Sequence, residues 1–180
     1  MQDYNSIIMD CFENFLSVKI PDNQQKKIDN ILNELVKQKS KEYGHIIDNR
    51  NELKRWRNGL MGEMAVQLFL GIDFLDLSVG YSIDYNHPDI EKFGIGVKTV
   101  EWGKFPIINK KNEYPQLFVI INNIRNIIYI CGVATTEVLN TYQDDNLVLD
   151  VNLRKKNTKS GFYGFKFLLP LNEYLQKERI

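Results

Sequence analysis

A short segment near the middle of the chain carries the side chains best suited to chemistry. It runs from His87 to Thr99, where a Pro-Asp turn leads into an apolar run that contains Lys98. Glu63 lies upstream within a stretch of helical spacing, and Gln116 opens the next apolar run. Hydrolysis of a phosphodiester needs a metal ion to offset negative charge and to lower the pKa of the attacking water. Mg²⁺ takes oxygen ligands, and a lysine beside it can stabilise charge on the phosphate.

The order of these residues resembles that of the PD-(D/E)XK nuclease superfamily, which has the restriction-endonuclease-like fold. In that family a helix glutamate precedes a three-stranded sheet, an aspartate begins the second strand, and an acid-X-Lys tripeptide lies in the third. Glu63, Asp89 and Lys98 match the helix acid, the aspartate and the lysine. The resemblance covers roughly 51–139 and implies a DNA nuclease that depends on Mg²⁺ or Mn²⁺. It also implies DNA as the partner and a homodimer as an expected assembly.

The resemblance assigns a role to each of these residues. Asp89, Glu63 and the backbone carbonyl of Val97 would bind the metal. Lys98 would orient or help to deprotonate the attacking water and stabilise charge at the phosphate. Gln116 would hydrogen-bond the water or the phosphate.

The chain departs from the family pattern at the second acid of the motif. Gly96 stands two residues before Lys98, and strand alternation places both positions on one face. Glu101 is the nearest acid downstream, and we take it as a candidate metal ligand. Glu101 lies three residues after Lys98, so strand alternation places the two side chains on opposite faces of the strand. A β-bulge near Gly103 would be needed to turn Glu101 to the Lys98 face. Glu91 is a second substitute.

Each of these residues also has an ordinary structural interpretation. A Pro-Asp pair before a strand is common turn chemistry, and His87 fits a solvated turn. Lys98 alone is typical of an edge strand that resists aggregation, and Glu63 alone of an exposed helix position. Their order along the chain, on the expected kinds of element, favours the catalytic interpretation.

The first third of the chain has the apolar spacing of helices. One pattern runs from Ile7 to Leu16, a second from Ile28 to Val36, and a third helix is expected over about 51–70 with Gly71 at its end. Gly59 and Gly62 inside the third helix are unusual, since each costs roughly 1 kcal/mol of helix stability relative to Ala. They indicate close packing against a strand.

The period then changes to that of strands, separated by Gly, Asn, Asp and Pro. From 71 to 134 the pattern is typical of an antiparallel sheet. Thr135 or Thr136 should cap a short helix through Tyr142, and a final helix should follow Pro170. Strands are expected at Leu75–Tyr85, Phe93–Glu101, Gln116–Asn122, Ile127–Ala134, Leu147–Leu153 and Phe162–Leu169.

This order predicts an α+β fold in one domain of 180 residues. The expected core is restriction-endonuclease-like, a central mixed β-sheet flanked by helices. We divide the chain into a helical N-terminal extension (1–45), a nuclease-like core (50–153) and a C-terminal strand and helix (154–180).

Composition excludes several other classes. Lys+Arg and Asp+Glu both total 23, so net charge gives no argument for or against a nucleic-acid partner. The basic residues do cluster, at 54–57 and at 154–159, where they could contact phosphates. Two cysteines and two histidines provide no zinc-type spacing, and no organic cofactor is expected. No apolar run is long enough for a membrane span and the acidic N-terminus does not fit a signal peptide, so we expect a cytoplasmic protein.

Two functional hypotheses follow. The first is a metal-dependent DNA nuclease, encoded by a phage or another mobile element, which uses Asp89 and Glu63 as ligands and Lys98 as the catalytic lysine. The second is a catalytically inactive protein of the same fold that binds nucleic acid or a protein partner, motivated by Gly96. An unrelated α+β interaction domain remains a third interpretation.

Overall fold

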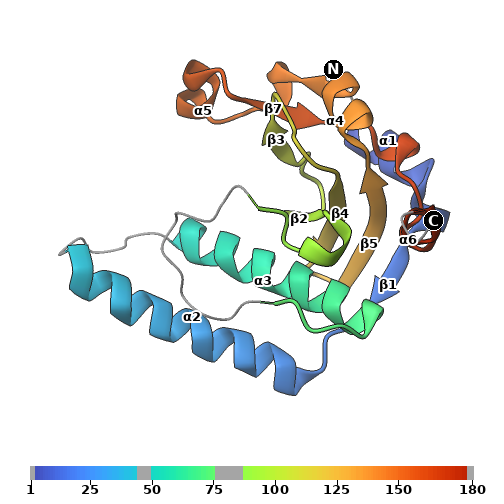
Figure 1. Cartoon of the computed structure of the whole chain (residues 1–180). Helices are drawn as coiled ribbons and strands as arrows, with labels where there is room; N and C mark the ends of the chain where they lie inside the picture. Colours follow the sequence, from blue (N-terminus) through green and yellow to red (C-terminus); the bar gives the residue numbers. More distant parts are fainter. Residues whose placement is uncertain (1–2, 44–49, 76–86, 178–180) are drawn as a thin grey trace.

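The computed structural model describes residues 3–43, 50–75 and 87–177. The chain has an α+β fold with a mixed four-stranded sheet flanked by helices (Figure 1). The strand order is β1-β5-β4-β2; β5 is antiparallel to both neighbours, whereas β2 runs parallel to β4. The strands are β1 (Leu16–Val18), β2 (Gly96–Glu101), β4 (Gln116–Asn122) and β5 (Ile127–Ala134).

The two central strands are buried on both faces. Alternate residues of β4 enter two different hydrophobic clusters, with Leu117 and Val119 on one side and Phe118 and Ile120 on the other. Such strands are nearly continuous in apolar residues, because neither face meets water. This explains why the sequence shows these two strands so clearly.

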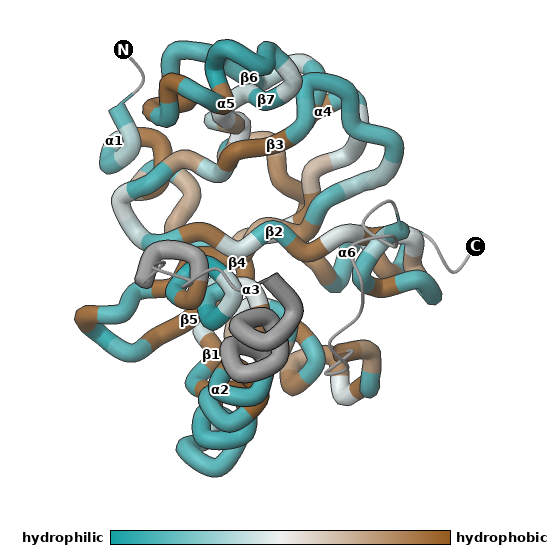
Figure 2. Tube along the Cα trace, turned by 90° about the vertical axis from the view of Figure 1, so that its left-hand side faces the viewer, coloured by the Kyte–Doolittle hydropathy of each residue, from teal (hydrophilic) through white to brown (hydrophobic). Residues whose placement is uncertain are grey.

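Helices α3 (Arg50–Leu70) and α2 (Asp22–Tyr43) cover one face of the sheet. Figure 1 shows α3 between the sheet and α2, and Figure 2 shows that the outer helix α2 is largely hydrophilic. A Cβ added to Gly62 would lie 1.9 Å from the Thr99 Oγ1 of β2, so α3 approaches the strand at this glycine. Gly59 has no atom within 4 Å of such a Cβ, so close packing explains only one of the two glycines.

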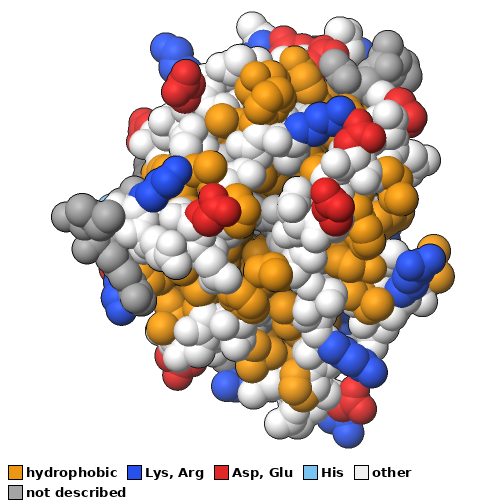
Figure 3. All heavy atoms as spheres, turned by 90° about the vertical axis from the view of Figure 1, so that its right-hand side faces the viewer, with side chains coloured by type: hydrophobic (Ala, Val, Ile, Leu, Met, Phe, Trp, Pro, Cys, Tyr) orange, Lys and Arg blue, Asp and Glu red, His pale blue; other side chains and the backbone are white. Residues whose placement is uncertain are grey.

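A small second sheet and short helices cover the opposite face. Its strand order is β3-β7-β6, and the Phe162 ring of β7 stacks on Phe118 of β4 at 4.5 Å between centroids. Figure 3 shows the face that carries α1, β1 and α6, where hydrophobic atoms gather near the centre and charged groups are spread around them. The elements that cover the opposite face of the sheet are α1 (Tyr4–Met9), β3 (Ile107–Asn109), α4 (Thr136–Thr141), β6 (Gln143–Asp144) and β7 (Lys159–Phe162). Helix α6 (Leu171–Lys177) instead buries Leu171 and Tyr174 in the cluster on the α3 side.

Several predicted elements are confirmed. The helices over 28–36 and 51–70 correspond to α2 and α3, and Gly71 follows α3 with a positive φ of 64°. The Thr135 side chain caps α4, and α6 follows Pro170. The strands expected at 116–122 and 127–134 are β4 and β5, and β2 corresponds to the second half of the strand expected at 93–101.

Other predictions were wrong. The first helix ends at Met9, and a 3₁₀ turn leads into β1, which pairs with β5; the segment 1–45 is therefore not wholly helical. The sheet is not antiparallel throughout, because β2 runs parallel to β4. The expected strand Leu147–Leu153 instead contains the end of a 3₁₀ turn and the start of helix α5 (Val151–Lys156). The expected strand Phe162–Leu169 ends at Phe162 and continues into a 3₁₀ turn at Phe165–Phe167. Most of the strand expected at Leu75–Tyr85 lies outside the described residues.

Among the helices of the described ranges, none combines the length and apolar character that a membrane crossing requires.

Candidate active site

Asp89 is held against the beginning of β2 by a tight turn of the chain. Ile90 and Ile95 pair across this turn through two backbone hydrogen bonds, and Gly94 permits the reversal with a φ of 62°. The turn brings the Asp89 carboxylate to the Val97 N–H, which donates a hydrogen bond to Oδ2 at 2.5 Å. The aspartate is therefore not at the start of a long strand, but its carboxylate is fixed at the strand that carries Lys98.

The Val97 carbonyl points to the same side as Asp89. Gly96 N–H bonds the Pro115 carbonyl and Trp102 N–H bonds the Ile121 carbonyl, so the even-numbered residues of β2 direct their polar groups toward β4. Because the N–H and C=O of one strand residue point the same way, Val97 directs both groups away from β4. Within the described part of the chain β2 is an edge strand, which leaves this carbonyl free of sheet pairing.

Glu63 approaches the same place from α3. It follows Gly62, whose close contact with Thr99 sets the distance between helix and strand. Burial raises the pKa of Glu63 to about 8, and repulsion by the Asp89 carboxylate adds to the effect. Burial also raises the pKa of Asp89, although the Val97 N–H and the Lys98 ammonium act in the opposite direction. A carboxyl group whose ionisation is opposed by a neighbouring carboxylate marks a place where a cation would be stabilised.

Lys98 lies on the other face of β2 from Val97 and is largely buried. Burial lowers the pKa of its ammonium to about 8, repulsion by Lys159 and Arg55 lowers it further, and the Asp89 carboxylate opposes them. A lysine with this pKa exchanges its proton near neutral pH, as a group that assists proton transfer must.

A hollow of about 220 Å³ opens beside these groups. Asp89, Val97 and Lys98 line it together with Gln116, so the structure brings most of the sequence-predicted site residues to one place. Glu63 does not line the hollow, but it is close enough to Asp89 for that carboxylate to raise its pKa. The remaining lining residues are His87, Ile108, Asn109, Asn112, Tyr114 and Lys159.

Gln116 occupies the space that the missing acid would need. It pairs with Gly96 across the parallel strands, and a Cβ built on Gly96 would lie 2.6 Å from Gln116 Nε2 and 2.8 Å from the Tyr114 ring. A carboxamide from the neighbouring strand thus lies where the motif would place a carboxylate.

The structure does not bring Glu101 to this hollow. Its carboxylate makes ion pairs with Lys54 at 2.5 Å and Lys104 at 2.6 Å, and it also accepts hydrogen bonds from Asn58 and Asn123. Burial opposes ionisation of this carboxyl group, but the hydrogen bonds from Lys104, Lys54 and Asn58 outweigh it and lower its pKa to about 2. Glu101 lines a different pocket, at the other end of β2, and Glu91 lies exposed in the turn before Gly94.

Sequence reasoning missed Tyr114 and did not connect Lys159 to Lys98. Lys159 was recognised only as part of a basic segment; in the structure its ammonium donates to the Asn109 side chain at the wall of the hollow. Tyr114 precedes Pro115 and Gln116, and a tyrosine just before a buried strand was the available signal. The exposed His87 contributes its backbone carbonyl as an acceptor for the Tyr114 hydroxyl at 3.4 Å.

The donor set suits a hard cation with few protein ligands. No cluster of three or more His, Cys, Asp or Glu side chains occurs in the parts of the chain that the structure describes. Two carboxylates and one unpaired carbonyl are available, and Mg²⁺ commonly keeps several waters beside one or two carboxylates. The donors therefore fit Mg²⁺ or Mn²⁺ better than zinc, which prefers nitrogen and sulfur ligands.

Comparison of the chain with protein-family models, with curated proteins and with solved structures finds no match in any of the three.

Proposed function

We propose that this protein is a metal-dependent nuclease of the PD-(D/E)XK type that hydrolyses phosphodiester bonds in DNA. The observation that supports this best is the pairing of Glu63 with Asp89, whose carboxylate is held by the Val97 N–H next to the largely buried Lys98. The fold beneath it, a mixed sheet with a helix across one face, agrees with a restriction-endonuclease-like core.

Each residue of the site would have a separate role in metal binding, proton transfer or orientation of the water. Glu63, Asp89 and the Val97 carbonyl would hold Mg²⁺ or Mn²⁺, which supplies charge neutralisation and an acidified water. Lys98 Nζ, with its lowered pKa, would accept or return a proton at the attacking water and place positive charge next to the phosphate. The Gln116 carboxamide would orient the same water by a hydrogen bond.

The surroundings of the hollow suit a phosphate-bearing substrate. Lys159 and Asn109 lie at its wall, and the Lys110 ammonium lies close by, bonded to Asp145 and Asn157 at 2.5 Å. Helix α5 adds Arg154, Lys155 and Lys156 in its last turn. Such side chains contact phosphates without reading bases, so the site favours backbone recognition over sequence specificity.

The first test is calorimetric titration of Mn²⁺ into the wild type, Asp89→Asn and Asp150→Asn. Asp150 is an exposed aspartate that caps α5 and does not line the hollow, and Asn caps helices equally well, which makes this variant a matched control. We expect binding in the wild type and the control and loss of binding in Asp89→Asn.

The second test is cleavage of end-labelled single-stranded DNA, duplex DNA and RNA with Mg²⁺, Mn²⁺ or EDTA. Lys98→Met keeps the length of the side chain and removes its charge; we expect cleavage to fall by about 10²-fold or more. The exposed Lys26→Met, on the outer helix α2, is the control. Absence of cleavage of every substrate by the wild type with either metal would count against the nuclease.

A specific observation favours a second candidate, a catalytically inactive protein of this fold that binds nucleic acid or a protein. The Gln116 amide and the Tyr114 ring fill the position of the second acid. Under this alternative the hollow binds a phosphate group through Lys98 and Lys159 without hydrolysis. Tight DNA binding in EDTA, unchanged in Asp89→Asn and with no cleavage in Mn²⁺, would favour it.

A further inference from the structure

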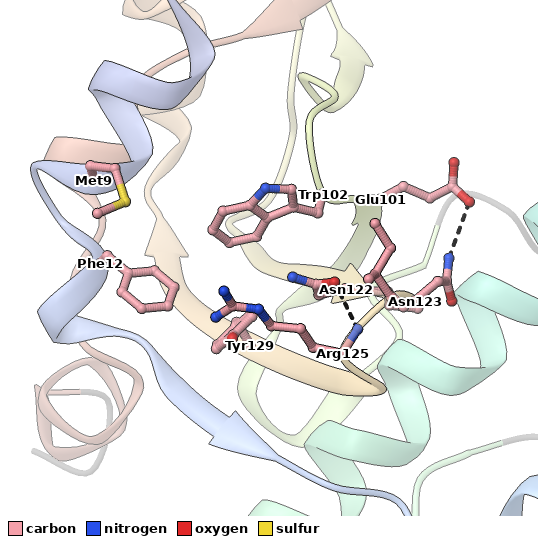
Figure 4. A pocket seen from close by; sticks show the side chains of 10 residues that line it. Met9, Phe12, Glu101, Trp102, Asn122, Asn123, Arg125 and Tyr129 are labelled. Carbon is pink, nitrogen blue, oxygen red and sulfur yellow. Dashed lines mark hydrogen bonds between the residues drawn. The ribbon is translucent and has the colours of Figure 1, made fainter.

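A second and larger pocket lies at the other end of β2. Its volume is about 620 Å³, within the range of sites that hold a ligand of nucleotide size. Three segments far apart in the sequence build it: the N-terminal segment, the residue after β2, and the β4–β5 hairpin with its turn (Figure 4). We call it the aromatic pocket; the side chains that matter below are Phe12, Trp102, Asn122, Asn123, Arg125 and Tyr129.

Three aromatic rings form a rigid wall. The Trp102 and Tyr129 centroids lie 5.8 Å apart, and Phe12 meets both rings edge-on at 5.8 and 5.1 Å. These separations are too short to admit another ring between them, since stacked rings need about 3.5 Å on each side. A planar ligand would instead stack on the side of the wall that faces the pocket. Aromatic walls of this kind bind bases of any sequence, because every base has a π-face.

Arg125 gives the pocket a positive charge. Its backbone N–H donates to Asn122 Oδ1 at 3.1 Å, which fixes the hairpin turn. Figure 4 shows the side chain extending from that turn toward Phe12, with the Trp102 indole on the opposite side. Within the described residues the Arg125 guanidinium makes no ion pair, and it lies beside the partly buried Phe12 and Trp102 rings and the buried Tyr129 ring. An arginine in such a place can bind a phosphate through two parallel hydrogen bonds.

The carboxylate in the lining does not oppose an anion. Glu101 is paired with both Lys54 and Lys104, so this group of three carries a net positive charge. Figure 4 shows its carboxylate turned away from the rings and bonded to Asn123. Asn122 places its carboxamide between Trp102 and Arg125 in the same view, where it can meet the polar edge of a bound base.

We propose that the aromatic pocket binds a nucleotide, with its base on the aromatic wall and its phosphate on Arg125. The site is distinct from the Asp89 hollow: the two share no lining residue and lie at opposite ends of β2. The binding does not depend on the nuclease activity. The bound nucleotide could be a free mononucleotide or one residue of a DNA strand, since both present a base and a phosphate.

The test is calorimetric titration of deoxyadenosine monophosphate, in EDTA so that no metal-dependent reaction occurs. Arg125→Gln is the test variant, in an exposed turn where the fold does not need the charge, and the exposed Lys26→Gln on the outer helix α2 is its control. We expect Arg125→Gln to weaken binding by about tenfold or more, as loss of a charged phosphate contact does, and Lys26→Gln and Asp89→Asn to leave it unchanged. Trp102 fluorescence, followed in a Trp56→Phe background that removes the other tryptophan, should be quenched by the nucleotide and gives a second measurement at the wall itself.

Three further ligands show which parts of the nucleotide are bound and whether it belongs to a DNA strand. Deoxyadenosine and inorganic phosphate each lack one half of the nucleotide, and each should bind more weakly than the whole. A 5′-phosphorylated deoxyadenosine decamer that binds more tightly than the mononucleotide would identify a DNA strand as the source; equal affinity would identify the free nucleotide. The proposal is overturned if neither the mononucleotide nor the decamer binds, or if Arg125→Gln binds as tightly as the wild type.

Discussion

Gln116 and Gly96 face each other across the parallel strands β4 and β2, and the Gln116 amide lies where a side chain on residue 96 would begin. The glycine is therefore a requirement of packing as well as a departure from the motif. It leaves Glu63 and Asp89 as the acids of the candidate site, with a carboxamide beside Asp89 in the hollow.

This relationship predicts that an acid cannot simply be restored at residue 96. Gly96→Ala should lower the free energy of unfolding by about 1–3 kcal/mol, because its Cβ meets Gln116 at 2.6 Å and the Tyr114 ring at 2.8 Å. Gln116→Ala in the same chain should recover part of this loss. Urea unfolding of the two single variants and the double variant measures the coupling. Additive effects would show that the two positions do not compete for space.

The two glycines of α3 provide a matched pair. Gly62→Ala would place a methyl 1.9 Å from Thr99 Oγ1, and we expect a loss of about 1–3 kcal/mol together with weaker Mn²⁺ binding, since Glu63 moves with the helix. Gly59→Ala meets no atom within 4 Å and should stabilise the protein by up to about 1 kcal/mol. Thermal unfolding and Mn²⁺ titration of both variants test this. Equal effects of the two substitutions would contradict the close approach of α3 to β2.

Much of this arrangement was accessible from the sequence. β4 and β5 were predicted because two-sided burial requires long apolar runs, and α3 because its apolar positions follow the helical period. The parallel pairing of β2 with β4 was not predicted, because an apolar pattern does not encode the direction of a strand. The segment 147–153 was misread because Leu147, Leu149, Val151 and Leu153 alternate like a strand. Capping was the stronger signal: the Asp150 side chain accepts from the Asn152 and Leu153 N–H groups and begins α5.

The site shows the same division. Glu63, Asp89 and Lys98 were predicted as site residues from their type and order, which needs no coordinates. The contact of Gln116 with Gly96 depends on strand register, and the Tyr114 position depends on the loop before β4; neither follows from composition or spacing. The role of Glu101 as a metal ligand was uncertain because strand alternation places it on the face opposite Lys98. In the structure it pairs instead with two lysines, one from α3 and one from the turn after β2.

The carboxyl pair predicts an unusual pH dependence of stability. Glu63 has a folded pKa of about 8 against an ordinary value of 4.5, so the unfolded chain loses this proton first as pH rises. Stability therefore falls between about pH 4.5 and 8, by at most about 1.4 kcal/mol per pH unit. Glu63→Gln should remove this slope, as urea unfolding at pH 5, 6, 7 and 8 would show.

Mn²⁺ should reverse this dependence. Binding requires the ionised carboxylates and so releases protons, and a bound ion stabilises only the folded state. The gain in melting temperature on adding Mn²⁺ should increase from pH 6 to pH 8 in the wild type and be absent in Asp89→Asn. A gain that is independent of pH would place the metal away from the pair.

Glu101 should make stability depend on pH in the direction opposite to Glu63. Its folded pKa of about 2 lies below the ordinary value of 4.5, so its contribution is fully present above about pH 4.5 and is lost as pH falls toward 2. Glu101→Gln keeps the shape of the side chain and removes the ion pairs with Lys54 and Lys104, whose side chains are largely exposed and therefore screened. We expect a loss of about 1 kcal/mol at pH 7 and a smaller difference from the wild type at pH 3. Mn²⁺ binding should be unchanged, because Glu101 lies outside the Asp89 hollow. A variant that loses metal binding while its stability is unaffected would instead make Glu101 a ligand.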